Sequence, residues 1–162
     1  MDERPLLSSG SSGDGAGDGD GIHTELLTAA RVAQAYPLAR FCNPALTYED
    51  WRALCRDSSP TAGTLLAVCG RGYIRAICRF TAQRTLRHGY ALLLDDLASG
   101  HPLDPARFAP LLIRQAEEHA RSLGCATLLM RVPDEAAWLR HVLEAEGHQA
   151  AGICFAKPIA RR

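Results

Sequence analysis

Three apolar segments in succession, joined by short turns, constrain the fold more than any other feature of this chain. Residues 64–69 are apolar, and residues 73–83 alternate between apolar and polar side chains. Residues 90–98 read YALLLDDLA and are the most apolar of the three. A Gly-Arg-Gly turn at 70–72 separates the first pair, and Gly89 ends the turn before the third. This pattern predicts an antiparallel meander of three strands.

A long amphipathic helix is predicted after the meander, over residues 105–123. Asp104 stands at its N-cap position, Pro105 falls in its first turn and Gly124 follows its last turn. Its apolar side chains recur along one stripe at helical spacing. The next predicted elements are a strand over 127–132, a helix from Asp134 to about Glu146 and a last strand over Ile153–Ile159.

The segment before the meander predicts one weak strand and two helices, each helix with a threonine at its N-cap position. These are a strand over 22–27, a helix over 29–41 after Thr28, and a helix after Thr47 that ends near Arg56. The order of predicted elements is therefore βαα-βββ-αβ-αβ. This order indicates an α/β or α+β fold in which helices pack on one sheet.

Residues 1–21 differ from the rest of the chain in composition, and we expect a flexible tail there, followed by one domain over 22–162. The tail holds five acidic residues and one basic residue. From Ser8 to Gly21 it contains no apolar side chain larger than that of Ala16. Such a segment cannot bury enough apolar surface to offset the entropy lost on ordering it.

Composition argues against several classes of protein. The chain carries 18 basic and 18 acidic residues, so its net charge of zero gives no support for a nucleic-acid partner. No apolar run reaches the length of a membrane span, and the N-terminal residues lack the apolar segment of a secretory signal. We therefore expect a cytoplasmic protein.

The spacing of the cysteines gives no metal-ligand pattern. None of the six cysteines lies within four residues of another, so we expect no metal site. Trp51 and Trp138 are interpreted as core side chains.

Four segments of the chain are similar to parts of the GNAT N-acetyltransferase superfamily. They are 36–51, which resembles the first two helices; 88–97, the fourth strand with its Asp-Asp-Leu end; 119–130, with the Leu-Gly-Cys corner; and 141–159, the C-terminal helix and strand. The order of elements over 22–159 is also the GNAT order. The resemblance implies a mixed, mostly antiparallel central sheet with helices on both faces. It also implies acetyl transfer from acetyl-CoA to an amine of a small molecule or a protein.

The resemblance implies that the thioester lies in a cleft where the fourth and fifth strands splay apart. Backbone groups just after a bulge in the fourth strand, here about Leu97 and Ala98, would hold the pantetheine arm. Asp95 and Asp96 precede them, and strand alternation would point only one of these two acids into the cleft as a general base. The alternative is that both acids only end the strand and pair with arginines.

The resemblance also implies a diphosphate site on the backbone N–H groups that open the central helix. The family pattern there is Arg/Gln-x-x-Gly-x-Gly/Ala, and the matching residues are 104–109. Asp104 and Arg107 depart from the pattern, whereas Ala109 agrees with it. We expect the Arg107 side chain to replace the missing backbone contact, together with Phe108 and Ala109.

Leu143 stands where many members of the superfamily have a tyrosine that protonates the departing thiolate. Three hypotheses follow for the function. The first is an acetyl-CoA-dependent N-acetyltransferase. The second is a GNAT-fold binding or regulatory module that has lost efficient catalysis. The third is a structural domain that pairs two copies of the chain as a homodimer through an exposed sheet edge. The acceptor amine is not indicated by any segment of the sequence.

Overall fold

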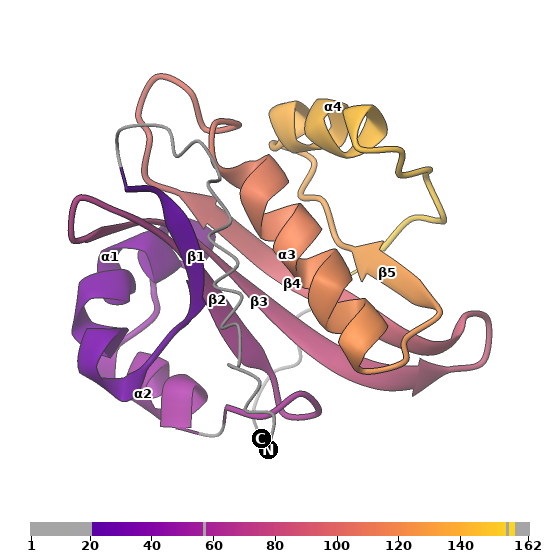
Figure 1. Cartoon of the computed structure of the whole chain (residues 1–162), viewed down its shortest axis with the longest axis horizontal. Coiled ribbons are helices and arrows are strands. Elements are labelled where there is room, and N and C mark those ends of the chain that lie inside the picture. Colours follow the sequence, from indigo (N-terminus) through magenta and orange to yellow (C-terminus); the bar gives the residue numbers. More distant parts are fainter. Residues whose placement is uncertain (1–20, 57, 155, 158–162) are drawn as a thin grey trace, which may run out of the picture.

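Five strands form one sheet in the spatial order β1-β2-β3-β4-β5 (Figure 1). The computed structural model describes residues 21–56, 58–154 and 156–157, so the predicted tail up to residue 20 lies outside the described residues. The strands are β1 (His23–Leu26), β2 (Thr64–Gly70), β3 (Tyr73–Thr85), β4 (Gly89–Ser99) and β5 (Thr127–Met130). The helices are a 3₁₀ turn η1 (Ala29–Arg31), α1 (Val32–Cys42), α2 (Tyr48–Arg56), α3 (Ala109–Ser122) and α4 (Ala137–Ala145).

The predicted meander is confirmed as β2, β3 and β4. Neighbouring strands from β1 to β4 run antiparallel, and β5 joins β4 in parallel. The turn between β2 and β3 contains Arg71 and Gly72 with φ of 53° and 79°, the left-handed pair that a tight hairpin turn needs. The expected mixed, mostly antiparallel sheet with helices on both faces is therefore the observed architecture.

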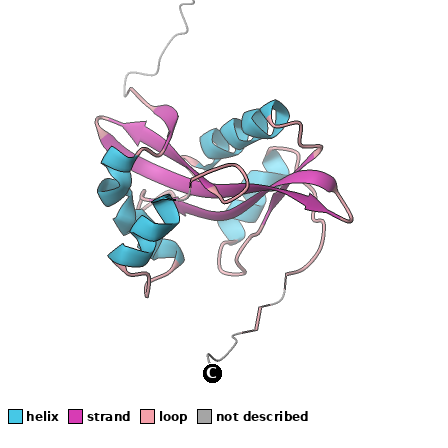
Figure 2. Ribbon diagram, turned by 90° about the horizontal axis from the view of Figure 1, so that it is seen from below, coloured by secondary structure: helices cyan, strands magenta, loops and turns pink. Residues whose placement is uncertain are grey.

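Helices cover both faces of this sheet, and each face has its own apolar core (Figure 2). On one face α3 packs over the middle strands around Phe80, Leu92 and Leu112. On the opposite face α1 and α2 pack through Leu38 and Trp51. Helix α4 packs beside α3 (Figure 1). None of the helices described here is both long and apolar enough to cross a membrane.

The predicted start of the central helix at Pro105 is wrong by four residues. Helix α3 begins at Ala109, its N-cap is Phe108, and Asp104 does not cap it. The reason is a second proline: Pro110 occupies the first helical turn, where a missing N–H costs nothing. Residues 105–108 form a turn instead.

The C-terminal elements also differ from the prediction. Helix α4 begins at Ala137 rather than after Asp134, because residues 134–136 lie in a turn in which the Ala136 N–H donates to the Pro133 carbonyl. The predicted last strand is not formed at the described positions 153–154 and 156–157, and its other residues lie outside the described part of the chain.

Candidate active site

One extra residue in β4 determines where the two acids of this strand lie. Phe80 pairs with Leu94, and the preceding residue of β3, Arg79, pairs with Asp96, so Asp95 is left as a β-bulge. Directly opposed residues of two strands share one face of the sheet. Phe80 and Leu94 face α3, so the bulge turns Asp96 to the opposite face, beside Arg79.

The end of β4 has an open edge where β5 stops. The parallel pairing runs from Ala91 opposite Thr127 to Leu94 opposite Met130, and the Arg131 N–H still donates to the Leu94 carbonyl at 3.1 Å. Beyond this point β4 continues to Ser99 with only β3 beside it among the described strands. The described strands therefore leave one edge of β4 open around Leu97 and Ala98, the region in which the resemblance implied a cleft.

A buried polar atom lies at the same edge. The hydroxyl oxygen of Ser99 is buried and has no hydrogen-bond partner among the described residues. Buried polar atoms are almost always hydrogen-bonded. A buried hydroxyl without a partner is therefore consistent with a site in which a polar ligand provides the missing hydrogen bond. Leu97 packs toward α3 and α4, whereas Ala98 belongs to the core under α1.

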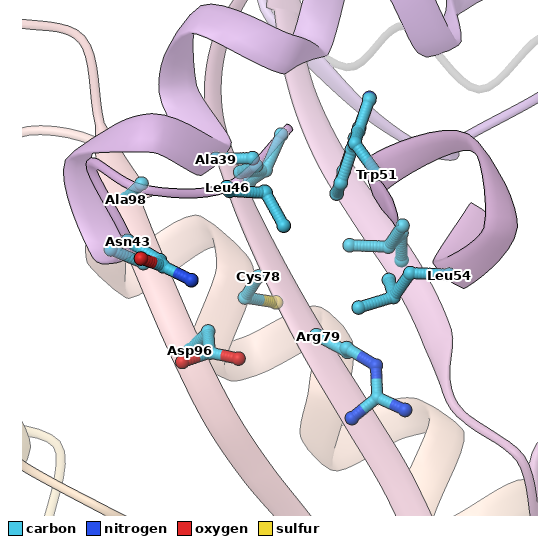
Figure 3. Close-up of a pocket in the computed structure, with 12 residues that line it drawn as sticks. Ala39, Asn43, Leu46, Trp51, Leu54, Cys78, Arg79, Asp96 and Ala98 are labelled. Atoms are coloured by element: carbon cyan, nitrogen blue, oxygen red, sulfur yellow. The ribbon is translucent and has the colours of Figure 1, made fainter. Parts of the chain in front are cut away.

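A cavity of about 240 Å³ lies on the other face of β4, under α1 and α2 (Figure 3). Its walls are mainly apolar, and three polar side chains project from three different segments: Asn43 after α1, Arg79 on β3 and Asp96 on β4 (Figure 3). We call it the α1–α2 pocket. Its lining residues are Ala39, Cys42, Asn43, Leu46, Trp51, Leu54, Leu65, Ile77, Cys78, Arg79, Asp96 and Ala98.

The guanidinium of Arg79 is held in place by the loop before β2. Its Nη2 donates to the Ala62 carbonyl at 2.7 Å, and its Nη1 lies 3.8 Å from the Asp95 carboxylate. Gly63 makes this possible, because a Cβ on this residue would overlap the guanidinium. Gly63 also has a φ of +122°, a region that L side chains rarely adopt.

The two neighbouring acids have different electrostatic surroundings. Asp95 lies between two arginines, with Oδ1 3.2 Å from the Arg131 guanidinium and Oδ2 3.8 Å from that of Arg79. Asp96 faces the α1–α2 pocket, where burial and the nearby charge of Asp95 raise its carboxyl pKa against the opposing effect of the two arginines. The arrangement makes Asp95 an ion-paired anchor and leaves Asp96 free to accept a proton.

The turn before α3 offers few backbone donors for an anion. The N–H groups of Arg107 and Ala109 already donate to carbonyls three residues earlier, at 3.2 Å each. Pro105 and Pro110 have no N–H to offer. Within 105–110 the turn therefore presents the N–H groups of Ala106 and Phe108.

The side chains of this turn leave its surface accessible. Phe108 is buried in the core beneath α3, and the Arg107 guanidinium lies over its ring, 5.6 Å from the centroid. Asp104 is exposed, and its backbone N–H donates to Nδ1 of His101 at 2.9 Å. Arg107 is exposed to solvent.

The structure shows where Trp51 and Leu143, two residues singled out in the sequence, lie. Trp51 is a core side chain, as expected, but it also lines the α1–α2 pocket, and its Nε1 donates to the Val32 carbonyl at 2.8 Å. Leu143 is buried against Ala109 and Ile113 of α3, so it serves the core. Arg79 and Asn43 were not among the residues predicted for the site; cross-strand pairing with Asp96 could have identified Arg79, but no motif marks Asn43.

Three side chains of metal-binding type meet at the other edge of the sheet. Ligand atoms of His23, Glu25 and Cys69 lie within 4.8 Å of one another. The Arg31 guanidinium already donates to two of them, at 2.7 Å to Glu25 and 3.0 Å to the sulfur of Cys69. The carboxylate here is thus neutralised by an arginine, which makes the cluster an ion-paired brace between η1 and the sheet.

Comparison with known proteins found matches only among solved structures. No family model and no curated protein matches the chain. The aminoglycoside N-acetyltransferase AAC(6')-Iy in complex with CoA superposes with a TM-score of 0.75 at 12% identity, over 88% of this chain and 98% of that one. A GNAT family acetyltransferase from Staphylococcus aureus superposes at 0.68 and 12% identity, over 85% and 98%. A transcriptional regulator from Bacillus halodurans C-125 superposes at 0.71 and 14% identity, over 85% and 99%. The chain has the fold of the GNAT acetyltransferases, as the sequence resemblance implied.

Proposed function

We propose that this chain is a divergent GNAT N-acetyltransferase that transfers an acetyl group from acetyl-CoA to an amine bound in the α1–α2 pocket. The observation that carries the proposal is the bulge at Asp95, which places the Asp96 carboxylate in a pocket directly beside the open edge of β4. This arrangement supports a general base and an acyl-donor groove that share one strand.

The open edge of β4 suits the amide-rich arm of the donor. On the side of β4 that faces away from β3, no described strand occupies the edge near Leu97 and Ala98, and the buried hydroxyl of Ser99 can supply a further hydrogen bond. The diphosphate end fits less well, because the turn before α3 offers two backbone N–H groups and the Arg107 side chain. We therefore expect the donor to bind through Arg107, Phe108 and Ala106, with a smaller backbone contribution than the family pattern implies.

In this proposal Asp96 acts as the general base. Bound acetyl-CoA supplies an activated acetyl carbonyl, and the Asp96 carboxylate removes a proton from the acceptor ammonium so that its nitrogen can attack. A raised pKa makes this carboxylate a stronger base than an ordinary aspartate. Leu143, which stands in place of a tyrosine, has no proton to donate, so the leaving group of bound acetyl-CoA would have to be protonated by water.

A second candidate function is a regulatory module that keeps the fold without efficient catalysis. Two observations favour it: the glycine-free turn at 104–109 and the apolar Leu143. A solved structure described as a transcriptional regulator superposes on this chain, and one fold can serve different functions, which supports a regulatory role as the second candidate.

Ligand-dependent stability separates these two functions. A ligand present at a hundredfold its dissociation constant stabilises the folded state by about 2.7 kcal/mol. We expect acetyl-CoA to raise the midpoint of thermal unfolding, and Arg107→Ala to weaken its binding about tenfold through loss of a charged phosphate contact. Arg87→Ala, at the exposed β3–β4 hairpin, is the matched control and should bind as the unmodified chain does. No shift at millimolar acetyl-CoA would favour the regulatory module.

A further inference from the structure

We infer that the acceptor is a small monoamine with an apolar body about the size of one ring, and not a polyhydroxylated polycation. This inference rests on the proposed function, because it takes the α1–α2 pocket as the acceptor site. Three properties of the pocket support it: the chemistry of its walls, its volume and its count of charges.

The walls offer an amine's carbon skeleton many apolar contacts and few hydrogen bonds. Leu46, Trp51, Leu54, Leu65 and Ile77 line the cavity from α2, the loop before it, and strands β2 and β3. The single polar atom of the indole is already used, because it donates to a backbone carbonyl of α1. Sugar hydroxyls would lose their water here and could gain partners only from Asn43, Arg79 and Asp96, so most of them would be left unpaired at a cost in free energy.

The volume admits one ring with a short arm. An apolar cavity of about 150 Å³ holds benzene. The α1–α2 pocket, at about 240 Å³, exceeds this by the space of a few further atoms. A molecule of several linked sugar rings would have to leave most of its body outside the pocket.

The charges suit a single ammonium group. Asp96 and Arg79 are the charged residues of the lining. The other nearby carboxylate, Asp95, is engaged by Arg79 and Arg131. One ammonium can therefore pair with Asp96, whereas a second would meet the Arg79 guanidinium, and like charges at close range repel.

Tryptophan fluorescence provides a direct binding assay, because the chain has two tryptophans and only Trp51 lines the pocket. In a Trp138→Phe protein, titration with 2-phenylethylamine at pH 7 should change the Trp51 emission saturably. The matched probe 2-phenylethanol, which lacks the charge, should bind at least tenfold more weakly. Kanamycin, an aminoglycoside, should neither change the emission nor displace the amine.

A pair of leucine variants tests the location. Leu54 is 38% exposed at the pocket wall, so Leu54→Arg can fold while placing a cation at the entrance, and it should weaken the amine at least tenfold. Leu86→Arg, on the fully exposed hairpin, is the control and should leave binding unchanged. Circular dichroism of both variants verifies that each is folded.

Two results would overturn the inference: equal affinity for the amine and the alcohol, or kanamycin binding in the pocket in preference to 2-phenylethylamine. Because the titration needs no acetyl-CoA, it is independent of turnover, which mass spectrometry of the products measures separately. Amine binding without acetylated product would refute the proposed function and keep the ligand class. Acetylated kanamycin with no amine binding would refute the ligand class and keep the function.

Discussion

Asp95 and Asp96 are adjacent in sequence, yet their carboxylates meet different partners. Two arginines flank Asp95, whereas Asp96 faces an apolar pocket in which burial, followed by the charge of Asp95, raises its pKa above the ordinary 3.8. The sequence identified both acids as candidate bases and predicted that only one would face the cleft. It could not decide between them, because the choice depends on which residue of β4 is bulged, and the continuous run YALLLDDLA does not reveal that position.

Asp96→Asn should lower kcat/KM about 10²- to 10⁴-fold, the usual contribution of a general base. The base works as a carboxylate, so activity should fall as the pH drops through its raised pKa. Asp95→Asn removes a neighbouring negative charge and should move this acid limb to lower pH. The measurement is the pH dependence of kcat/KM for the variants and the unmodified chain with the same amine. The titration of the substrate then affects every profile equally. Glu144→Gln, on the exposed surface of α4, should leave the profile unchanged.

At the scale of elements, the strands were easier to predict from sequence than the helix ends and the pocket. The meander has strong alternation and clear turns, whereas the start of α3 depended on a choice between Pro105 and Pro110. The α1–α2 pocket was not predicted, because its walls come from five elements (α1, α2, β2, β3 and β4) whose packing no local pattern encodes. Trp51 was interpreted as a core residue for the same reason.

The loop before β2 is predicted to control the position of Arg79. Gly63→Ala should destabilise the fold by about 1–3 kcal/mol, because it strains the backbone at φ +122° and drives a Cβ into the guanidinium. It should also lower kcat/KM by displacing Arg79 from the pocket wall. Gly72→Ala is the matched control: its φ is +79° and no atom lies within 4 Å of the added carbon, so only the backbone cost should remain. Equal kinetic effects of the two variants would contradict this role of Gly63.

On the scale of the whole molecule, one sheet serves two apolar cores. The same strands contribute alternate residues to the clusters under α3 and under α1 and α2, so neither core can persist without the sheet. This arrangement predicts that both faces unfold together.

Leu112→Ala tests this coupling. The side chain is fully buried between α3 and the sheet, and its truncation should cost about 2–5 kcal/mol. In a Trp138→Phe background, urea unfolding should remain a single transition when it is followed by far-UV circular dichroism and by emission of Trp51, which lies on the opposite face. Leu86→Ala, at a fully exposed position, should change stability by less than about 0.5 kcal/mol. Two separate transitions would show that the faces are independent.

The bulge at Asp95 also decides how β4 tolerates changes in its length. Deleting Asp95 would remove the bulge and leave Asp96 opposite Arg79, so the faces on which Asp96, Leu97 and Ala98 lie would not change. Inserting one residue after Asp96 would instead exchange the two faces for the rest of the strand, and Leu97 would leave the core under α3 for the side of the pocket. Over evolutionary time, insertions between Asp96 and Ser99 should therefore be rejected more strictly than the loss of Asp95 or a substitution at a single position.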